Sequence, residues 1–198
     1  MWLVSAPVAA QEHNTFAIGA GATHRMSPDP DARGDGGFGL KWRIGHAETG
    51  WGWHYGLNWY STNLHRDIGG RSTPLGELKI RPFLGGYGYT HRLTERLTLA
   101  GDVIGGFAFS AIELTPSADA ALHVPAGHNV RVLTGSTPVL KPEVSVWYDL
   151  SRKFGISVDA GYILARPKLT IASPGLNETE RIRADAFTIS SGIVYRIF

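Results

Sequence analysis

Charged side chains recur at every second position in several segments of the chain, between apolar neighbours. Because successive side chains of a β-strand point to opposite faces, this spacing predicts that the charges share one face of a sheet. Charges in a protein interior are tolerated only when they are paired and hydrogen-bonded, so we expect a salt-bridge network on that face. By parity the network contains Lys41, Arg43, Lys79, Arg81, Asp102, Lys141, Glu143, Asp159 and Arg196.

Residues for nucleophilic catalysis are a second possibility, because acyl chemistry needs a nucleophile, a base and an orienting group within hydrogen-bond reach. The nearest local candidates are His54 with Ser61, and His65 with Asp67 and Ser72. His54 and Ser61 have opposite strand parity, and the other three residues lie in a polar segment. The eight histidines show no metal-site spacing, and the chain has no cysteine. We therefore assign no catalytic residue, no metal ligand and no cofactor.

The composition favours strands over helices. The 198 residues include 25 Gly, 6 Trp, 7 Tyr and 8 Phe, and the mean hydropathy is −0.08. That mean value excludes a bundle of membrane helices, each of which needs about 20 apolar residues. The net charge is only +2 and no basic run is present, which argues against a nucleic-acid partner.

Period-two alternation predicts eight strands of about ten residues each. The strands are expected near residues 15–22, 38–44, 51–60, 78–89, 97–109, 140–148, 156–164 and 187–197, with an unclear phase after Gly86 that a bulge near this point would explain. The connections alternate long and short, and the long ones are 26–37, 62–76, 111–136 and 166–184. Outer-membrane barrels combine short periplasmic turns with long extracellular loops, and an even strand number puts both termini on the short-turn side.

The polar parity is mostly Gly, Ala, Ser and Thr with scattered charges, which suits the crowded interior of an eight-stranded barrel. We place Lys79, Arg81, Lys141 and Glu143 toward the long loops and the other network residues toward the short turns. The opposite parity is apolar and is predicted to form an aromatic girdle at the membrane interfaces. Its members are Trp42, Trp51, Trp53, Tyr55, Trp59, Tyr148 and Tyr162.

The pattern over residues 15–198 resembles the small outer-membrane β-barrels, the group that includes the OmpA-like transmembrane domain and OmpW-like proteins. Terminal Phe198, preceded by alternating apolar residues that include Tyr195, looks like the signal that the barrel-assembly machinery reads. In that group an aromatic residue usually stands two positions before the terminal Phe, in its parity; here Arg196 occupies that position.

The resemblance implies an all-β, eight-stranded, antiparallel, up-and-down transmembrane barrel in the outer membrane of a Gram-negative-type bacterium. It also implies outer-membrane lipid or lipopolysaccharide and the assembly machinery as partners, and it allows membership of a larger membrane assembly. Residues 1–10 end in Ala9-Ala10 and are expected to be the remnant of a signal peptide, with residues 11–198 as a single barrel domain.

The predicted function is that of a structural or surface-loop-binding membrane protein whose lumen is plugged by the charged network. Three alternatives stay open. They are a lipid-A-modifying acyltransferase or deacylase, a narrow pore that prefers anions because basic residues outnumber acidic ones, and a soluble lipocalin-like carrier with an apolar interior.

Overall fold

The computed structural model describes residues 16–28, 32–44, 49–68, 71–115, 131–173 and 176–197, in which the regular elements are all strands. Their bounds are β1 Phe16–Met26, β2 Ala32–Ile44, β3 Gly50–Ile68, β4 Arg71–Arg92, β5 Leu97–Leu114, β6 Arg131–Thr134, β7 Thr137–Asp149, β8 Phe154–Ala165, β9 Lys168–Ser173, β10 Leu176–Arg181 and β11 Ala186–Arg196. No helix in these residues is long and apolar enough to cross a membrane.

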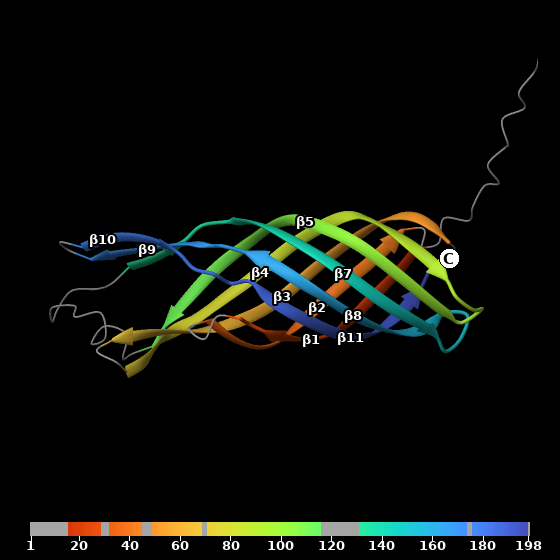
Figure 1. Ribbon diagram of the computed structural model, residues 1–198, viewed down its shortest axis with the longest axis horizontal. Coiled ribbons are helices and arrows are strands. Elements are labelled where there is room, and N and C mark those ends of the chain that lie inside the picture. Colours follow the sequence, from red (N-terminus) through yellow and green to blue (C-terminus); the bar gives the residue numbers. More distant parts are fainter. Residues whose placement is uncertain are drawn as a thin grey trace, which may run out of the picture.

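Eight of these strands close into one antiparallel barrel (Figure 1). The order around the barrel is β1-β11-β8-β7-β5-β4-β3-β2, and β1 pairs with both β2 and β11, which closes the ring. Apart from the closing pair of β1 with β11, each barrel strand is paired with the barrel strands that come before and after it in the chain. This is the topology of an up-and-down barrel. The predicted eight-stranded antiparallel barrel is confirmed.

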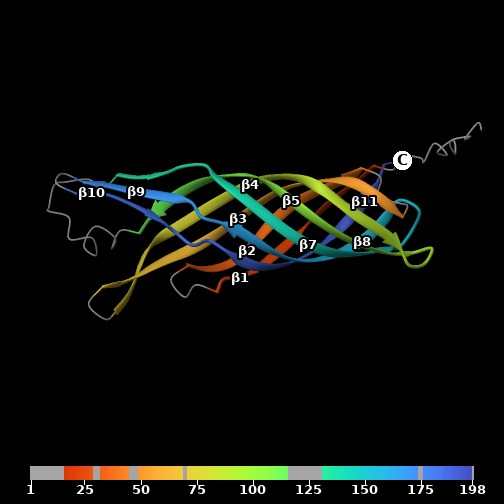
Figure 2. The same cartoon turned by 45° about the horizontal axis from the view of Figure 1, so that its top comes forward.

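The two ends of the barrel differ. At one end, which we call the turn end, tight turns join β4 to β5 and β7 to β8, and Ile197 donates its backbone N–H to the carbonyl of Phe16. At the other, the extension end, β3 and β4 continue as a long hairpin, and β6, β9 and β10 form a three-stranded sheet (Figures 1 and 2).

The prediction of a loop over 62–76 is wrong, because β3 and β4 stay paired through that region: Thr62 faces Leu78 and Asp67 faces Ser72. Part of the 166–184 loop is also regular structure, since β9 and β10 pair from Lys168 opposite Arg181 to Ser173 opposite Leu176. Strands pair through their backbones, so strands that do not contact lipid can carry polar side chains on both faces. For this reason the polar composition of these segments did not reveal that they are strands.

The predicted bulge after Gly86 is absent from the described β3–β4 pairing, which keeps one register from Gly50 opposite Thr90 to Leu64 opposite Gly76. β4 also approaches β5 closely at Gly86, where a Cβ atom would lie 2.1 Å from the carbonyl oxygen of Val103. The phase of β4 is therefore continuous, and Tyr87 and Tyr89 face outward in step with Phe83.

The outer surface of the barrel is apolar. β8 shows the pattern most clearly: Phe154, Ile156 and Val158 are exposed, while the residues between them are buried in the lumen. At about 3.3 Å per residue and a tilt near 45°, the 12 residues of β8 span about 28 Å along the barrel axis. That length covers the apolar band of outer-membrane barrels, which is about 25 Å tall.

Candidate functional site

The lumen is the candidate site, because it holds the buried ionisable side chains of the barrel. β2 and β7 lie opposite each other, four strands apart in either direction around the ring. Lys41 on β2 reaches across this diameter, and its Nζ lies 2.6 Å from Glu143 Oε1 on β7 and 2.5 Å from Asp159 Oδ1 on β8. Glu143 Oε2 also pairs with Lys141 Nζ at 2.6 Å.

A second cluster lies beside the first, nearer the turn end. Arg43 donates from Nη2 to Asp102 at 3.0 Å and to Ser145 Oγ at 2.6 Å, and its guanidinium stacks 4.7 Å from the centre of the Trp147 ring. His54 lies with Nδ1 2.6 Å from the same Asp102 oxygen. The side chains of Arg43 and Asp102 are fully buried.

We call these seven residues the charged layer: Lys41, Arg43, His54, Asp102, Lys141, Glu143 and Asp159. With a neutral His54 that donates to Asp102, the layer contains three cations and three carboxylates. Because each charge contacts at least one opposite charge, the cost of removing it from water is largely offset. Contacts from β2 to β5, β7 and β8 cross the lumen of the barrel at this height.

Toward the extension end the lumen changes character. The side chains that follow the charged layer along β5, β7 and β8 are Ile104, Val139 and Ile163, and they are 3%, 4% and 1% exposed. They belong to a buried cluster that we call the apolar layer: Tyr60, Leu64, Leu78, Ile80, Leu84, Ile104, Ala108, Val139, Ile163, Ala165, Ala184 and Ala186.

One cation lies against the apolar layer. Arg25 on β1 is 1% exposed, donates to Thr62 Oγ1 and, at 2.9 Å, to the carbonyl of Ala184, and stacks 4.6 Å from the Tyr60 ring. Its contacts in the described residues are a hydroxyl, a carbonyl and a ring, with no carboxylate. Among the lumen cations whose side chains the structure describes, Arg25 is therefore the one without a carboxylate partner.

Small residues line the side of the lumen formed by β1, β2, β3 and β11. Gly19, Gly21, Gly39 and Gly192 leave a cavity of about 40 Å³ beside Lys41. A buried water needs roughly 10–15 Å³ of such space, so the cavity has room for about three waters.

Two predicted members of the network lie on the wrong face. Lys79 and Arg81 point outward, while Leu78 and Ile80, which alternate with them along β4, are fully buried inside. The prediction assumed that the apolar parity of this strand met lipid. At the extension end the inside of the barrel is the drier side, and Lys79 instead pairs with Glu113 at 2.5 Å on the outer surface.

The predicted division of the charges between the two ends is also wrong for Lys141 and Glu143, which belong to the same layer as Lys41. Arg196 stands apart: it pairs with Asp149 at 2.8 Å next to the tight turns. The strand tilt of the barrel, which sequence position does not report, sets these heights.

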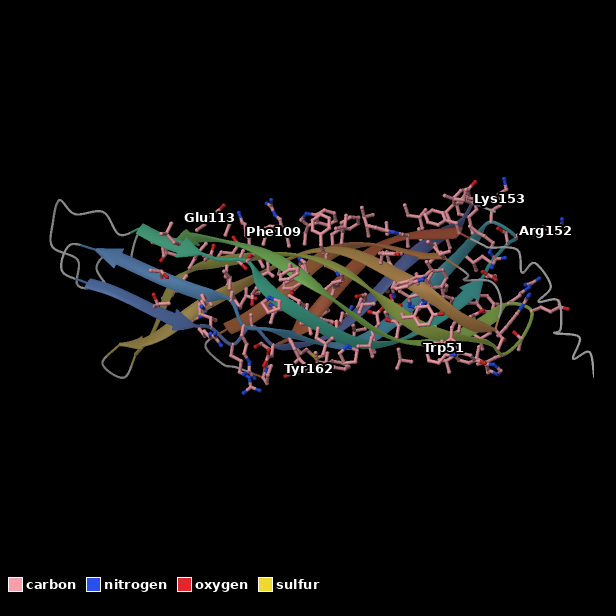
Figure 3. The ribbon with its side chains drawn as sticks, turned by 90° about the horizontal axis from the view of Figure 1, so that it is seen from above. Trp51, Phe109, Glu113, Arg152, Lys153 and Tyr162 are labelled. Atoms are coloured by element: carbon pink, nitrogen blue, oxygen red, sulfur yellow. The ribbon has the colours of Figure 1, made fainter. Side chains whose placement is uncertain are left out.

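The seven predicted girdle residues all lie on the outer surface, where Trp51, Trp53, Trp59 and Tyr148 are 65%, 53%, 37% and 41% exposed. Trp42 stacks on Tyr55 with ring centres 6.0 Å apart. Figure 3 shows Trp51 toward the turn end and Tyr162 projecting from the outer surface toward the extension end. Phe83, Tyr87, Phe107 and Phe109 enlarge this aromatic surface.

Of the predicted assembly signal, Tyr195 faces outward with its ring centre 5.1 Å from that of Phe154. Phe198 and the predicted signal-peptide remnant, residues 1–10, lie outside the described residues.

The two sets of catalytic candidates are placed differently. The second set lies on the β3–β4 hairpin, where Asp67 is the cross-strand partner of Ser72 and His65 precedes Asp67 by two residues. The first set does not converge. His54 points into the lumen, whereas Ser61 is seven residues further along β3 on the outer face, which is about 23 Å away at strand spacing. The His54 imidazole contacts Asp102, and the nearby Ser145 hydroxyl accepts from Arg43. In the part of the chain that is described, no group of three or more His, Asp or Glu residues is arranged to hold a metal ion.

Sequence reasoning missed several lumen residues. Trp147 and Ser145 share the parity of Lys141 and Glu143, and Arg25 shares the parity of the glycines of β1, so the face of each was readable. Their partners were not readable, because cross-lumen contacts join strands that are distant in sequence.

No family model and no curated protein matches the chain, but solved structures match its fold. The outer membrane protein OprG from Pseudomonas aeruginosa aligns at a TM-score of 0.75 and 16% identity, over 93% of this chain and 96% of OprG. A major outer membrane protein from Thermus thermophilus gives 0.65 at 12% identity, over 92% and 99%. The outer membrane protein AlkL gives 0.58 at 14% identity, over 97% and 94%.

At sequence identities this low, the structural matches establish the fold of the chain and nothing more. The chain is a small eight-stranded β-barrel of the outer-membrane type, and the resemblance read from its sequence is confirmed at that level. The apolar outer surface agrees with the outer-membrane location that these neighbours share.

Proposed function

We propose that this protein is a closed outer-membrane barrel that holds a β-structured extension at the cell surface without conducting solutes. The observation that carries the proposal is the ionic bridge across the lumen, where Lys41 joins β2 to β7 and β8. The apolar layer next to it adds a second obstruction, because its side chains are almost completely buried.

The extension is the part of the molecule that would meet partners. The β3–β4 hairpin continues to Ile68 and Arg71, and the sheet of β6, β9 and β10 rises from the same end of the barrel (Figure 2). Both are outside the apolar band, where long connections of outer-membrane barrels face the extracellular medium. Surface binding by this extension is the role that the geometry supports best.

The orientation can be tested with a protease site inserted between β5 and β6. In intact cells this site should be cleaved, and a matched site inserted in the turn at 93–96 should be protected until the outer membrane is permeabilised. If the site between β5 and β6 were protected and the site at 93–96 were cleaved in intact cells, the extension could not lie at the cell surface.

The closed lumen can be tested with liposomes that contain the purified protein. We expect no swelling in isosmotic arabinose, whereas liposomes with a general porin swell rapidly. Swelling that depends on the folded barrel would contradict the proposal and favour a pore.

A further inference from the structure

A groove of about 700 Å³ lies on the barrel wall where β7 begins and β8 gives way to β9. Its lower part is apolar: Leu140 and Leu164 are paired across the β7–β8 seam and are 45% and 37% exposed. The part of the groove nearer the extension end is basic, with Arg166, Lys168 and Arg181.

The three cations lie close together on one face. The outward parity of β8 continues from Leu164 through Arg166 to Lys168, and Lys168 is the direct partner of Arg181 on β10. Partners across an antiparallel pair have Cα atoms about 4.5–5.5 Å apart, and like charges in that position are unfavourable. An anion bound between them would remove the repulsion.

No carboxylate is among the side chains that line the groove in the described part of the chain. The nearest one that contacts a groove residue is Asp185, 3.8 Å from Arg166. Its side chain is 1% exposed and already accepts from the Ala165 backbone N–H and from Arg183, both at 3.0 Å, and the second of these hydrogen bonds raises the pKa of the Arg183 guanidinium. Asp185 therefore neutralises the groove only weakly.

We infer that this groove binds a phosphorylated glycolipid of the outer leaflet, with lipid A as the chemical type. Its acyl chains would lie over Leu140 and Leu164, and its phosphates would be held by Arg166, Lys168 and Arg181. Arginine and lysine recognise phosphate by charge-assisted hydrogen bonds. Three cations match a headgroup that carries more than one phosphate. The inference rests on the proposed orientation, which puts the extension end at the outer leaflet.

The test is binding of bisphosphorylated lipid A to the full-length protein in phosphatidylcholine nanodiscs. The triple variant Arg166→Gln/Lys168→Gln/Arg181→Gln should bind at least about tenfold more weakly, because charged hydrogen bonds to phosphate are lost. The matched control Arg96→Gln/Arg152→Gln/Lys153→Gln removes the same charge at the turn end and should bind within about twofold of the wild type.

Two competitors sharpen the result. Lipid A stripped of its phosphates, and phosphatidylglycerol with its single phosphate, should each compete at least about tenfold more weakly than intact lipid A. Equal binding by the groove variant and the wild type, or equal competition by either competitor, would overturn the inference.

Each variant is first checked for a fold-dependent shift between boiled and unboiled protein on a gel. If the triple variant does not fold, the single variant Lys168→Gln replaces it and should still weaken binding about threefold or more; an unchanged affinity would overturn the inference. If lipid A binding fails while the turn at 93–96 is protected in intact cells and the liposomes do not swell, the proposed function still stands. The lipid A inference and the proposed function can therefore be tested separately.

Discussion

The charged layer and the apolar layer close the same lumen by different physical means. In the charged layer each side chain depends on a partner from across the barrel, as Lys41 depends on Glu143 and Asp159. In the apolar layer the side chains fill space, and Ile80 or Leu78 contributes through packing alone. Loss of one charged partner leaves another charge buried and unpaired, whereas loss of an apolar group leaves a cavity whose cost varies with its size.

The largest effect is expected from Glu143→Gln. Lys141 would lose the carboxylate with which it pairs, and Lys41 would keep Asp159 alone; breaking a buried ion pair costs about 3–5 kcal/mol. The free energy of unfolding, measured by urea titration in lipid vesicles, should fall by that amount. Glu113→Gln is the control, since its exposed pair with Lys79 is worth about 0–1 kcal/mol. Equal losses in both variants would contradict the charged layer.

Truncation in the apolar layer should have a graded effect. Ile80 is fully buried, and Ile80→Ala should lower the free energy of unfolding by about 2–5 kcal/mol, while Ile80→Val should lower it by about 0.5–1.5 kcal/mol. The same urea titration measures both. If Ile80→Ala were neutral, the extension-end lumen would be open rather than packed.

Replacing one buried arginine beside each layer allows the energetic cost in the two layers to be compared directly. Arg25→Met leaves a hydroxyl and a carbonyl without their donor and should cost about 1–3 kcal/mol. Arg43→Met leaves the Asp102 carboxylate with His54 alone and should cost about 3–5 kcal/mol. The reverse order of the two losses in urea unfolding would show that Arg25 has a charged partner in the folded barrel.

The smallest effect is expected outside the barrel. Lys79→Ala should change the free energy of unfolding by less than about 1 kcal/mol, because its pair with Glu113 is partly exposed. A loss above about 3 kcal/mol, the size expected for a broken buried pair, would mean that Lys79 belongs to the lumen after all.

Much of the barrel was predictable from alternation, because lipid outside and a crowded interior impose a period of two on each strand. That rule assigned the faces of β5, β7, β8 and β11 correctly. It failed on β4, where Leu78 and Ile80 face the lumen and Lys79 faces outward. Beyond the apolar band the outside is wet and the inside is dry, so the meaning of the period reverses.

The composition of the charged layer was only partly predictable. The inward parity of Lys41, Asp102 and Glu143 follows from the sequence, but their contacts depend on which strands are opposite and on how far each is displaced along the axis. Strand tilt and stagger decide this, and they are properties of the closed barrel as a whole. The sequence analysis named His54 only as a catalytic candidate and did not single out Arg25, because the contacts of both depend on the closed barrel in the same way.

The most direct test of the closed lumen is single-channel conductance in a planar bilayer, with the wild type compared with Lys41→Ala/Glu143→Ala. The structure predicts no stable conductance steps for the wild type, and small steps for the double variant because the bridge from β2 to β7 is removed. Stable steps in the wild type that the double variant leaves unchanged would contradict a lumen closed by the charged layer.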